Sequence, residues 1–271
     1  MSAVRAKRYI IDTTLRDGEQ SAGLAFTSDD KYKMAMRMDT LGFYQIEAGI
    51  PALGNVEKEA ILRIMSDKKN TLISAWNRMN RGDIAHSFDC NPDIIHISAP
   101  VSYVQIYSKL RKNKKWLEKT LFDCIAFAQD KGFRVTVGLE DASRADESFL
   151  IALINHLKKY DVHHVRYADT VGVLTPTRSG EVINALTRYT DMDIDIHVHN
   201  DLGMAVANSL VCAKEGAKYI DCTFFGIGER AGNCNLLDFL HASEPIFDLG
   251  VDRSKAKQVQ NEIKDIVLGC N

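Results

Sequence analysis

Short runs of apolar residues rich in Val and Ile recur along the chain. A polar turn and a longer segment with apolar positions at the helical period follow each run. We interpret eight runs as strands, at residues 9–15, 44–48, 71–76, 94–98, 134–139, 164–168, 194–199 and 219–225. Helices are predicted at residues 28–41, 56–65, 81–88, 115–131, 146–160, 176–189, 203–215 and 235–247.

This alternation of strand and helix predicts an α/β fold, a TIM (β/α)8 barrel that occupies residues 1–271 as a single domain. The final segment, residues 251–271, is expected to form a charged helix that packs on the outside of the barrel. A doubly wound sheet is the alternative, but it requires a glycine fingerprint after the first strand. The turn there reads RDGEQ at residues 16–20, so we favour the barrel.

Charge and composition exclude several classes of partner. The 34 Lys and Arg residues nearly balance the 36 Asp and Glu residues, which argues against electrostatic capture of nucleic acid or a membrane surface. A small molecule is therefore the expected partner. The 6 cysteines form no CxxC pair, which is typical of reduced thiols, and we find no signal peptide or apolar run of about 18 residues. A cytoplasmic location is expected.

A barrel enzyme should carry its chemistry at the carboxyl ends of its strands. Polar and ionisable side chains do gather at the predicted strand ends, whereas surface charges would be scattered along the chain. In strand order, they are Arg16 and Asp17, Glu47, Arg78, His96, Glu140, Thr170, His197 and His199, and Glu229.

The most distinctive pair is His197 and His199, which lie two residues apart in an apolar strand and leave it on the same face. With a carboxylate from Asp17 they form a hard-to-borderline ligand set suited to Mg, Mn, Fe or Zn, with positions left open for substrate. Arg16 would then face charge that develops on the substrate. Structural histidines and a structural Arg16–Asp17 ion pair are the alternatives for each part alone, but the combination favours a metal site.

The sequence GIGERAGN at residues 226–233 follows the eighth predicted strand, where barrels commonly bind phosphate. Backbone N–H groups around Gly228 and Gly232 could approach a phosphorylated ligand such as coenzyme A, and Asn233 could offer an amide oxygen to the metal. Glycines also serve any tight turn, so this loop alone is weak evidence.

Other polar positions divide between site and scaffold. We expect Glu140 and Thr170 to face the cavity, and we expect helix-capping roles for Asp141, Arg144 and Asp169. A substrate site and a buried network remain equally open for Glu47, Arg78 and His96. We interpret Trp76 as a core residue and the His163–His164 pair as structural.

Seven motifs then place these residues in a known pattern: DTTLRDGEQ at 12–20, EAGIPALG at 47–54, HISAPVS at 96–102, EDASRAD at 140–146, ADTVGVLTP at 168–176, HVHNDLGMAVANS at 197–209 and GIGERAGN at 226–233. Together they run through nearly the whole chain. The chain resembles the acyl-CoA-using metal barrels of the isopropylmalate synthase, homocitrate synthase and HMG-CoA lyase superfamily. It is most similar to the homocitrate synthase of nitrogen fixation.

The resemblance implies a role for each matching residue. Asp17, His197 and His199 would bind a divalent metal, Mg, Mn or Zn with Fe or Co as alternatives, and Asn233 would be a fourth ligand. Arg16 would stabilise the enolate and the developing alkoxide, and Thr170 would contact the carboxylate of a 2-oxo acid. The loop of Gly228, Glu229 and Gly232 would meet the thioester. The cavity would also be lined by Gln20, Glu47, His96 and Glu140.

The implied activity is a Claisen-type condensation of acetyl-CoA with a 2-oxo acid. We favour 2-oxoglutarate, with 2-oxoisovalerate or pyruvate as alternatives. The choice stays open because Thr136 stands where the lysine-pathway enzymes of the family have Arg and the leucine-pathway enzymes Glu. Carbon–carbon cleavage by an acyl-CoA lyase is the competing activity, but the glycine loop has no cysteine before its closing Gly232–Asn233 pair.

The resemblance also shapes the expected assembly. The chain ends before the C-terminal lid segment of full-length synthases, which leaves the general base unassigned. A homodimer is expected. A further alternative is a metal-bearing barrel that is one subunit of a split synthase, inactive until a separate C-terminal subunit is present.

Overall fold

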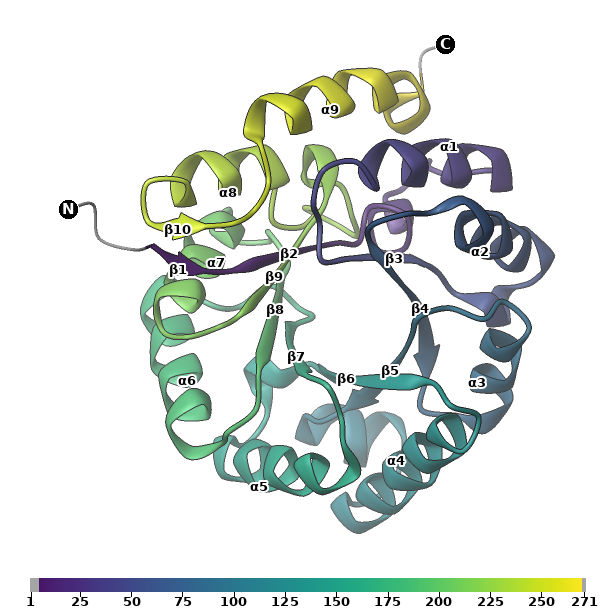
Figure 1. Cartoon of the computed structure of the whole chain (residues 1–271). Coiled ribbons are helices and arrows are strands. Elements are labelled where there is room, and N and C mark those ends of the chain that lie inside the picture. The colour runs from purple at the N-terminus through teal and green to yellow at the C-terminus, as the bar shows by residue number, and fades with distance from the viewer. Residues whose placement is uncertain (1–4, 270–271) are drawn as a thin grey trace.

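The computed structural model describes residues 5–269, and its centre is a closed barrel of eight parallel strands surrounded by helices (Figure 1). The strands are β2 (Tyr9–Asp12), β3 (Gln45–Gly49), β4 (Leu72–Arg78), β5 (Ile94–Pro100), β6 (Arg134–Glu140), β7 (Val165–Asp169), β8 (Ile194–Val198) and β9 (Tyr219–Cys222). Each strand pairs with the next, and β9 closes onto β2 with Tyr9 opposite Tyr219. The predicted TIM barrel is confirmed.

The helices follow the strands in the predicted order. They are α1 (Ser28–Met38), α2 (Asn55–Asp67), α3 (Arg81–Phe88), α4 (Lys114–Gln129), α5 (Glu147–Leu157), α6 (Pro176–Tyr189), α7 (Ala205–Lys214), α8 (Leu236–Ser243) and α9 (Arg253–Leu268). Short helical turns are η1 (Gly18–Gln20), η2 (Pro51–Leu53), η3 (Val104–Lys109), η4 (Ala142–Arg144), η5 (Lys158–Tyr160) and η6 (Phe224–Gly226).

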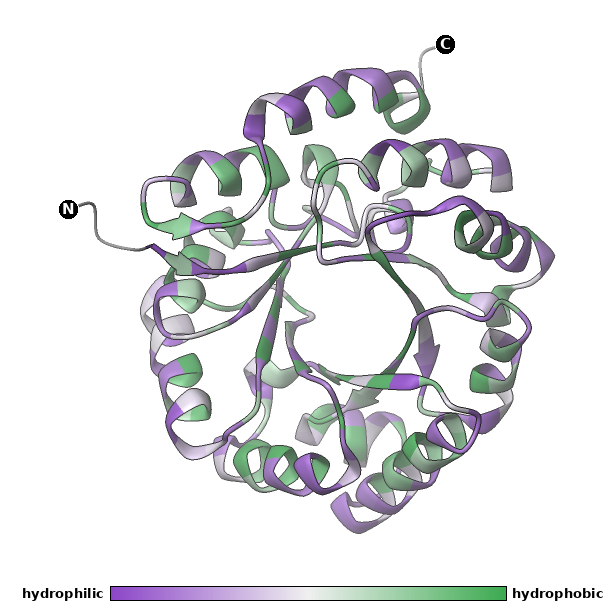
Figure 2. Cartoon of the chain, viewed as in Figure 1, coloured by the Kyte–Doolittle hydropathy of each residue, from purple (hydrophilic) through white to green (hydrophobic). Residues whose placement is uncertain are grey.

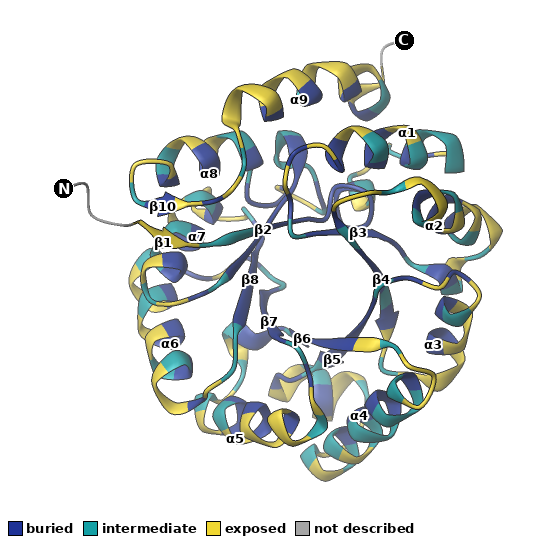
Figure 3. Ribbon diagram, viewed as in Figure 1, coloured by how far each residue is buried: buried dark blue, intermediate teal, exposed yellow. Residues whose placement is uncertain are grey.

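Local capping explains where several helices begin. Thr27 and Asp30 form a reciprocal capping box at α1, while the Asn113 and Asp146 side chains accept backbone N–H groups at the starts of α4 and α5. Pro176 opens α6, where its missing N–H has no helical partner to lose. Apolar residues alternate with polar ones around the ring (Figure 2), and the barrel strands are almost entirely buried (Figure 3).

The first predicted strand is too long. The chain leaves β2 at Asp12 because that carboxylate accepts the backbone N–H and the hydroxyl of Thr14, at 3.0 Å each, and so bends the backbone. Gly18 N–H then donates to the Thr13 carbonyl at 3.0 Å and completes the turn. As a result, residues 13–17 form a compact turn at the carboxyl end of β2.

One feature of the periphery was not expected from the sequence, and the terminal helix was. Strand β1 (Ala6–Lys7) pairs in parallel with β10 (Phe247–Asp248), and two-residue strands are too short to give a periodic pattern. Helix α9 lies beside α1 and α8, and its Val259, Ile263 and Val267 side chains are buried (Figure 1). Residues 270 and 271 of the predicted terminal segment lie outside the described residues. No helix within residues 5–269 is long and apolar enough to cross a bilayer.

The barrel interior is polar. Arg166 of β7 contacts Glu47 of β3 at 3.0 Å, and these strands are not neighbours, so the contact crosses the inside of the barrel. Arg166 also pairs with Asp195 at 2.6 Å and with Asp221 at 3.2 Å. All four side chains are buried, which places a network of charges beneath the mouth of the barrel.

Candidate functional site

Three buried side chains converge at the mouth of the barrel. The Nε2 atoms of His197 and His199 lie 3.2 Å apart, and they are 3.8 and 3.9 Å from Oδ2 of Asp17. His197 belongs to β8, whereas His199 lies just beyond the strand, in an isolated bridge with Asn233. The predicted shared face is present, and the donor atoms are close enough together to bind one cation.

A second carboxylate orients the first histidine. Asp221 Oδ2 lies 3.0 Å from Nδ1 of His197, and its Oδ1 accepts the Thr13 hydroxyl at 2.7 Å. Although burial lowers the pKa of His197, Asp221 raises it above its usual value. This contact engages Nδ1 and leaves Nε2 facing Asp17, the arrangement that orients metal-binding histidines. Burial and the neighbouring His197 lower the pKa of His199 to about 4, so that ring is neutral.

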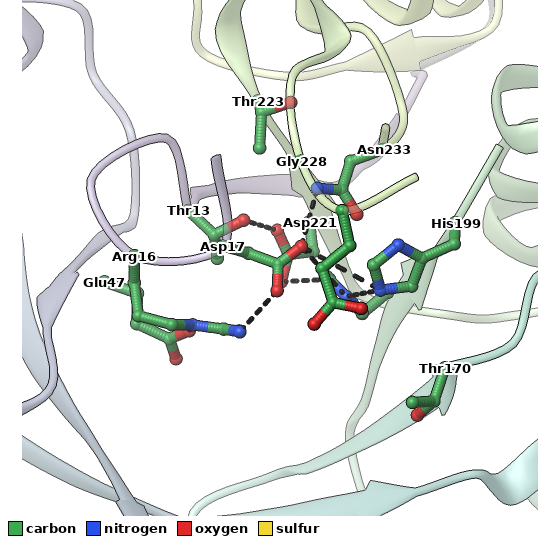
Figure 4. Close-up of polar contacts among 12 residues, drawn as sticks. Thr13, Arg16, Asp17, Glu47, Thr170, His199, Asp221, Thr223, Gly228 and Asn233 are labelled. Carbon is green, nitrogen blue, oxygen red and sulfur yellow. Dashed lines mark hydrogen bonds and ion pairs between the residues drawn. The ribbon is translucent and has the colours of Figure 1, made fainter. Parts of the chain in front are cut away.

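The side-chain amide of Asn233 lies beside this group, and its oxygen accepts no hydrogen bond from the described residues. Its Nδ2 donates to Asp17 Oδ2 at 2.6 Å (Figure 4) and also to the Ile227 carbonyl at 2.9 Å. Its Oδ1 is buried and accepts no hydrogen bond from the described residues. An unpaired buried polar atom is costly, and a cation beside it would remove that cost. One carboxylate and two imidazoles therefore fit a divalent metal, whereas Asn233 turns its Nδ2 rather than its Oδ1 toward Asp17.

Arg16 lies beside this group as a permanent cation. Its Nη1 binds Asp17 Oδ1 at 2.5 Å and its Nε binds Glu47 Oε1 at 2.6 Å. Burial lowers the pKa of Arg16, but the two carboxylates more than offset this and raise it. Despite burial, Arg16 and Arg166 hold the pKa of Glu47 well below its usual range. Figure 4 shows Arg16 and His199 on opposite sides of Asp17.

A cavity of about 200 Å³ opens beside these residues and brings most of the predicted site together. It is lined by the predicted residues Arg16, Asp17, Gln20, His96, Glu140, Thr170, His197, His199 and Glu229. Glu47 lies behind it, against Arg16. Trp76, which we expected in the core, lies on the cavity wall instead, with its ring 5.7 Å from the Arg16 guanidinium carbon.

Arg78 does not join this group. Its side chain is 68% exposed, forms an ion pair with Asp83 and borders a neighbouring cavity of about 350 Å³. Glu140 borders both cavities, where it lies 3.4 Å from the Ser98 hydroxyl and accepts from Gln105 Nε2 at 3.2 Å. Burial raises the pKa of Glu140, although Lys109 opposes this shift.

Two further cavity residues have fixed orientations. Thr170 Oγ1 accepts the backbone N–H of Asp141 at 2.8 Å, which leaves its hydroxyl hydrogen free to point elsewhere. His96 Nδ1 lies 2.9 Å from the Thr136 hydroxyl, and burial keeps the pKa of His96 well below its usual value. A Cβ at Gly138 would lie 2.6 Å from His96 Nε2, so the glycine makes room for this ring.

The expected structural residues make structural contacts. Asp141 forms a two-bond ion pair with Arg144, at 2.7 and 2.8 Å. Asp169 accepts the backbone N–H groups of Val173 and Leu174 at 3.1 and 3.0 Å. These contacts are structural, but the expected helix-capping roles are wrong: the Asp141 side chain makes no cap bond to η4, and Asp169 closes a turn that precedes α6.

The glycine loop is bonded to itself and to the first loop. Gly228 N–H donates to the Ser21 hydroxyl at 2.8 Å, and Gly232 N–H donates to the Glu229 carbonyl at 2.9 Å. Both amides are therefore engaged within the protein. A Cβ at Gly228 would lie 2.1 Å from Asn233 Nδ2, so glycine here allows the close approach of the amide.

Sequence reasoning missed Asp221 and Arg166. Both residues are buried and point into the barrel. Arg166 is two positions before Ala168, and Asp221 is two positions after Tyr219, so each pair lies on the same face of its strand. A charged residue inside an otherwise apolar strand was the available signal.

Comparison with known proteins agrees with this geometry. A family model described as HMGL-like matches residues 7–263. The chain is 46% identical to "Homocitrate synthase subunit alpha" of Clostridium pasteurianum, with 95% of this chain and 97% of that protein covered. It is 39% identical to "2-isopropylmalate synthase 2" of Caldanaerobacter subterraneus, with 94% of this chain and 67% of that protein covered.

A solved structure, the hydroxymethylglutaryl-CoA lyase from Pseudomonas aeruginosa, matches with a TM-score of 0.85 at 18% identity. That match covers 99% of this chain and 95% of the lyase, and it bears on the fold alone. The chain belongs to the HMGL-like family, and it is an enzyme of the acyltransferase type found among the homocitrate and isopropylmalate synthases of that family.

Proposed function

We propose that this enzyme joins the acetyl group of acetyl-CoA to the carbonyl carbon of a 2-oxo acid, with 2-oxoglutarate as the favoured acceptor. The observation that carries the proposal is the convergence of Asp17, His197 and His199 beside Arg16 in one cavity. The 46% identity to a protein named as a homocitrate synthase subunit supports 2-oxoglutarate over 2-oxoisovalerate and pyruvate.

The ligand set would hold a divalent cation, for which Mg, Mn and Zn are the first candidates and Fe and Co the alternatives. When bound there, such a cation polarises the acceptor carbonyl as a Lewis acid. The Thr170 hydroxyl accepts from Asp141 N–H and can donate its own hydrogen to the acceptor carboxylate. Gln20 lies on the same cavity wall and contributes an amide to the acceptor site.

Arg16 supplies electrostatic stabilisation. Loss of a proton from the acetyl methyl group places negative charge on the thioester oxygen, and the new carbon–carbon bond then moves charge to the acceptor oxygen. Arg16 is fixed by Glu47 and Asp17, and its Nη2 forms no hydrogen bond with the described residues. A donor held ready in a buried site stabilises such charge without reorganisation.

Glu140 is proposed to carry a proton. Burial raises its pKa, which favours a protonated carboxyl that can donate to the new alkoxide. Hydrolysis of the CoA thioester then releases coenzyme A and the acid product, which makes the overall reaction favourable.

We further propose that a separate polypeptide covers the mouth of the barrel and supplies the base for the acetyl methyl group. Exposed apolar side chains occur in the loops, short helical turns and first helix turn that follow β3, β5, β7 and β8: Leu53, Val56, Tyr103, Val104, Tyr107, Val173, Leu202 and Met204. The relative that this chain covers almost completely is named as one subunit of a synthase. A homodimer, coenzyme A binding by the glycine loop and a cytoplasmic location stay predictions.

Release of coenzyme A thiol tests the proposal. Acetyl-CoA is supplied with each of the three 2-oxo acids and with Mg, Mn or Zn, and 2-oxoglutarate should give the highest rate. Asp17→Asn should lower that rate by at least about a hundredfold, because it removes a metal ligand. Absence of thiol release with every pair, with and without the covering polypeptide, would contradict the condensation. Formation of acetyl-CoA from an added 3-hydroxyacyl-CoA would instead indicate a lyase.

A further inference from the structure

Glu19 belongs to the motif at residues 12–20 but contacts the scaffold. Its Oε1 accepts the backbone N–H of Phe26 at 2.8 Å, and its Oε2 binds Nζ of Lys31 at 2.7 Å. Lys31 is a residue of α1 with no exposed surface. The loop that carries Arg16 and Asp17 is therefore attached to a fully buried ammonium group.

The same ammonium group holds a second segment. Lys31 Nζ also forms an ion pair with Glu57 of α2, whose Oε2 accepts the backbone N–H of Ile50 at 2.7 Å. A Cβ at Gly49 would lie 2.0 Å from Glu57 Oε2 and 3.3 Å from Lys31 Nζ, so only glycine leaves room for this pair. Gly49 and Ile50 directly follow the part of β3 that carries Glu47.

We propose that Lys31 is a positioning residue for the active site. It joins two loops from behind: through Glu19 it holds the loop of Asp17 and Arg16, and through Glu57 it holds the segment after Glu47. This inference rests on the proposed metal-dependent function.

The cost of removing the Lys31 charge indicates that Lys31 positions the two loops rather than only filling space in the core. One ammonium group separates two carboxylates, and its removal would leave the buried Glu57 carboxylate facing the partly exposed Glu19 carboxylate without a cation between them. Breaking a buried ion pair on one side is much more disruptive than losing a surface pair, because the remaining charge is uncompensated. Relaxation of the loop held through Glu19 would change the distance between Asp17 and the two histidines, and relaxation of the segment after Glu47 would move the carboxylate that binds Arg16.

The test uses Lys31→Met, which keeps the length of the side chain and removes its charge. The Kd for Mn²⁺ is obtained by titration, with the free ion measured by its paramagnetic resonance signal. Lys31→Met should bind Mn²⁺ at least tenfold more weakly than the parent. A second readout needs no metal. In a Trp116→Phe background the only tryptophan is Trp76, which lies beside Arg16, and its quenching by acrylamide should increase about twofold in Lys31→Met.

Asp39→Asn is the matched control. Asp39 accepts the backbone N–H groups of Lys69, Asn70 and Thr71 beyond the other end of α1, so its loss should lower Tm without moving the mouth loops. This variant should keep the parent values of Mn²⁺ affinity and Trp76 quenching.

The outcomes separate the two proposals. A parent protein that does not bind Mn²⁺ would overturn the metal centre, and Trp76 quenching would still decide the role of Lys31. Parent values of both readouts in folded Lys31→Met, or changes no larger than those in Asp39→Asn, would overturn the positioning role. Should Lys31→Met fail to fold, Glu19→Gln decides in the same way, because it keeps the acceptor for Phe26 N–H and loses only the charge; about a threefold weaker Kd is expected.

Discussion

Two loops meet over the same metal-binding group and are held in different ways. The loop after β2, residues 13–27, carries Asp17 and is fixed by buried charges. The loop after β9, residues 223–235, carries Asn233 and is held by uncharged hydrogen bonds, glycine backbone conformations and exposed ion pairs. The Arg16 and Asp17 side chains are 8% and 4% exposed, whereas those of Arg230 and Glu229 are 41% and 43% exposed.

The difference in burial indicates that the two loops differ in how rigidly they are held. Removing one partner of a buried pair costs about 3–5 kcal/mol, while an exposed pair contributes about 0–1 kcal/mol. The first loop therefore keeps its charges at fixed positions. The second can adjust around a thioester without a large loss of stability. Three substitutions test this contrast.

The largest effect is expected in the first loop. Arg16→Gln removes the cation beside the reacting atoms and leaves Glu47 and Asp17 without one of their partners. The rate of thiol release should fall about 10²- to 10³-fold. Arg16→Lys keeps a charge but not the two-sided contact, so it should recover only part of the rate. A loss below tenfold in Arg16→Gln would show that the fixed charge is not needed.

An intermediate effect is expected from the glycine backbone of the second loop. Gly232 has φ +86°, and a Cβ there would lie 2.0 Å from the Gly226 carbonyl oxygen. Gly232→Ala must displace the loop next to Asn233, at a cost of about 1–3 kcal/mol, and metal affinity should fall about tenfold. Gly203→Ala is the matched control, since its φ is +69° with no atom within 4 Å. Equal losses of affinity in both variants would assign the effect to general strain.

The smallest effect is expected at the exposed pairs. Arg230 binds Asp201 at 2.8 Å, Glu229 at 2.7 Å and the Thr170 carbonyl at 2.9 Å. Arg230→Ala should change kcat little and raise KM for acetyl-CoA about two- to fivefold. Since salt screens exposed charges, the parent at high ionic strength should approach the same KM. A fiftyfold loss in kcat would show that the second loop is as rigidly required as the first.

The sequence predicted the barrel because strand and helix periods alternate without interruption. It also predicted the shared face of His197 and His199, since alternate strand residues project to one side. Partners across the barrel could not be predicted this way. Glu47 and Arg166 are 119 positions apart, and periodicity says that each faces inward without saying which residues meet there.

Lys31 illustrates a second limit. A lysine in a charged, amphipathic helix is expected at the surface, and only tertiary contacts with Glu19 and Glu57 explain its burial. Trp76 shows the reverse, because an apolar residue in a strand is expected in the core and instead faces a polar cavity. The end of the first strand was misjudged because the turn depends on Asp12 and Thr14 side-chain bonds.

The charges inside the barrel also have a collective consequence. Two guanidinium groups, Arg16 and Arg166, share this interior with four carboxylates: Asp17, Glu47, Asp195 and Asp221. Carboxylates therefore outnumber guanidinium groups in this interior, and burial raises the pKa of Asp195 to about 6. A divalent cation beside Asp17 would offset part of this negative charge. Because the ligands come together only in the folded barrel, cation binding and folding are thermodynamically linked. Tighter binding of the cation therefore raises the free energy of unfolding.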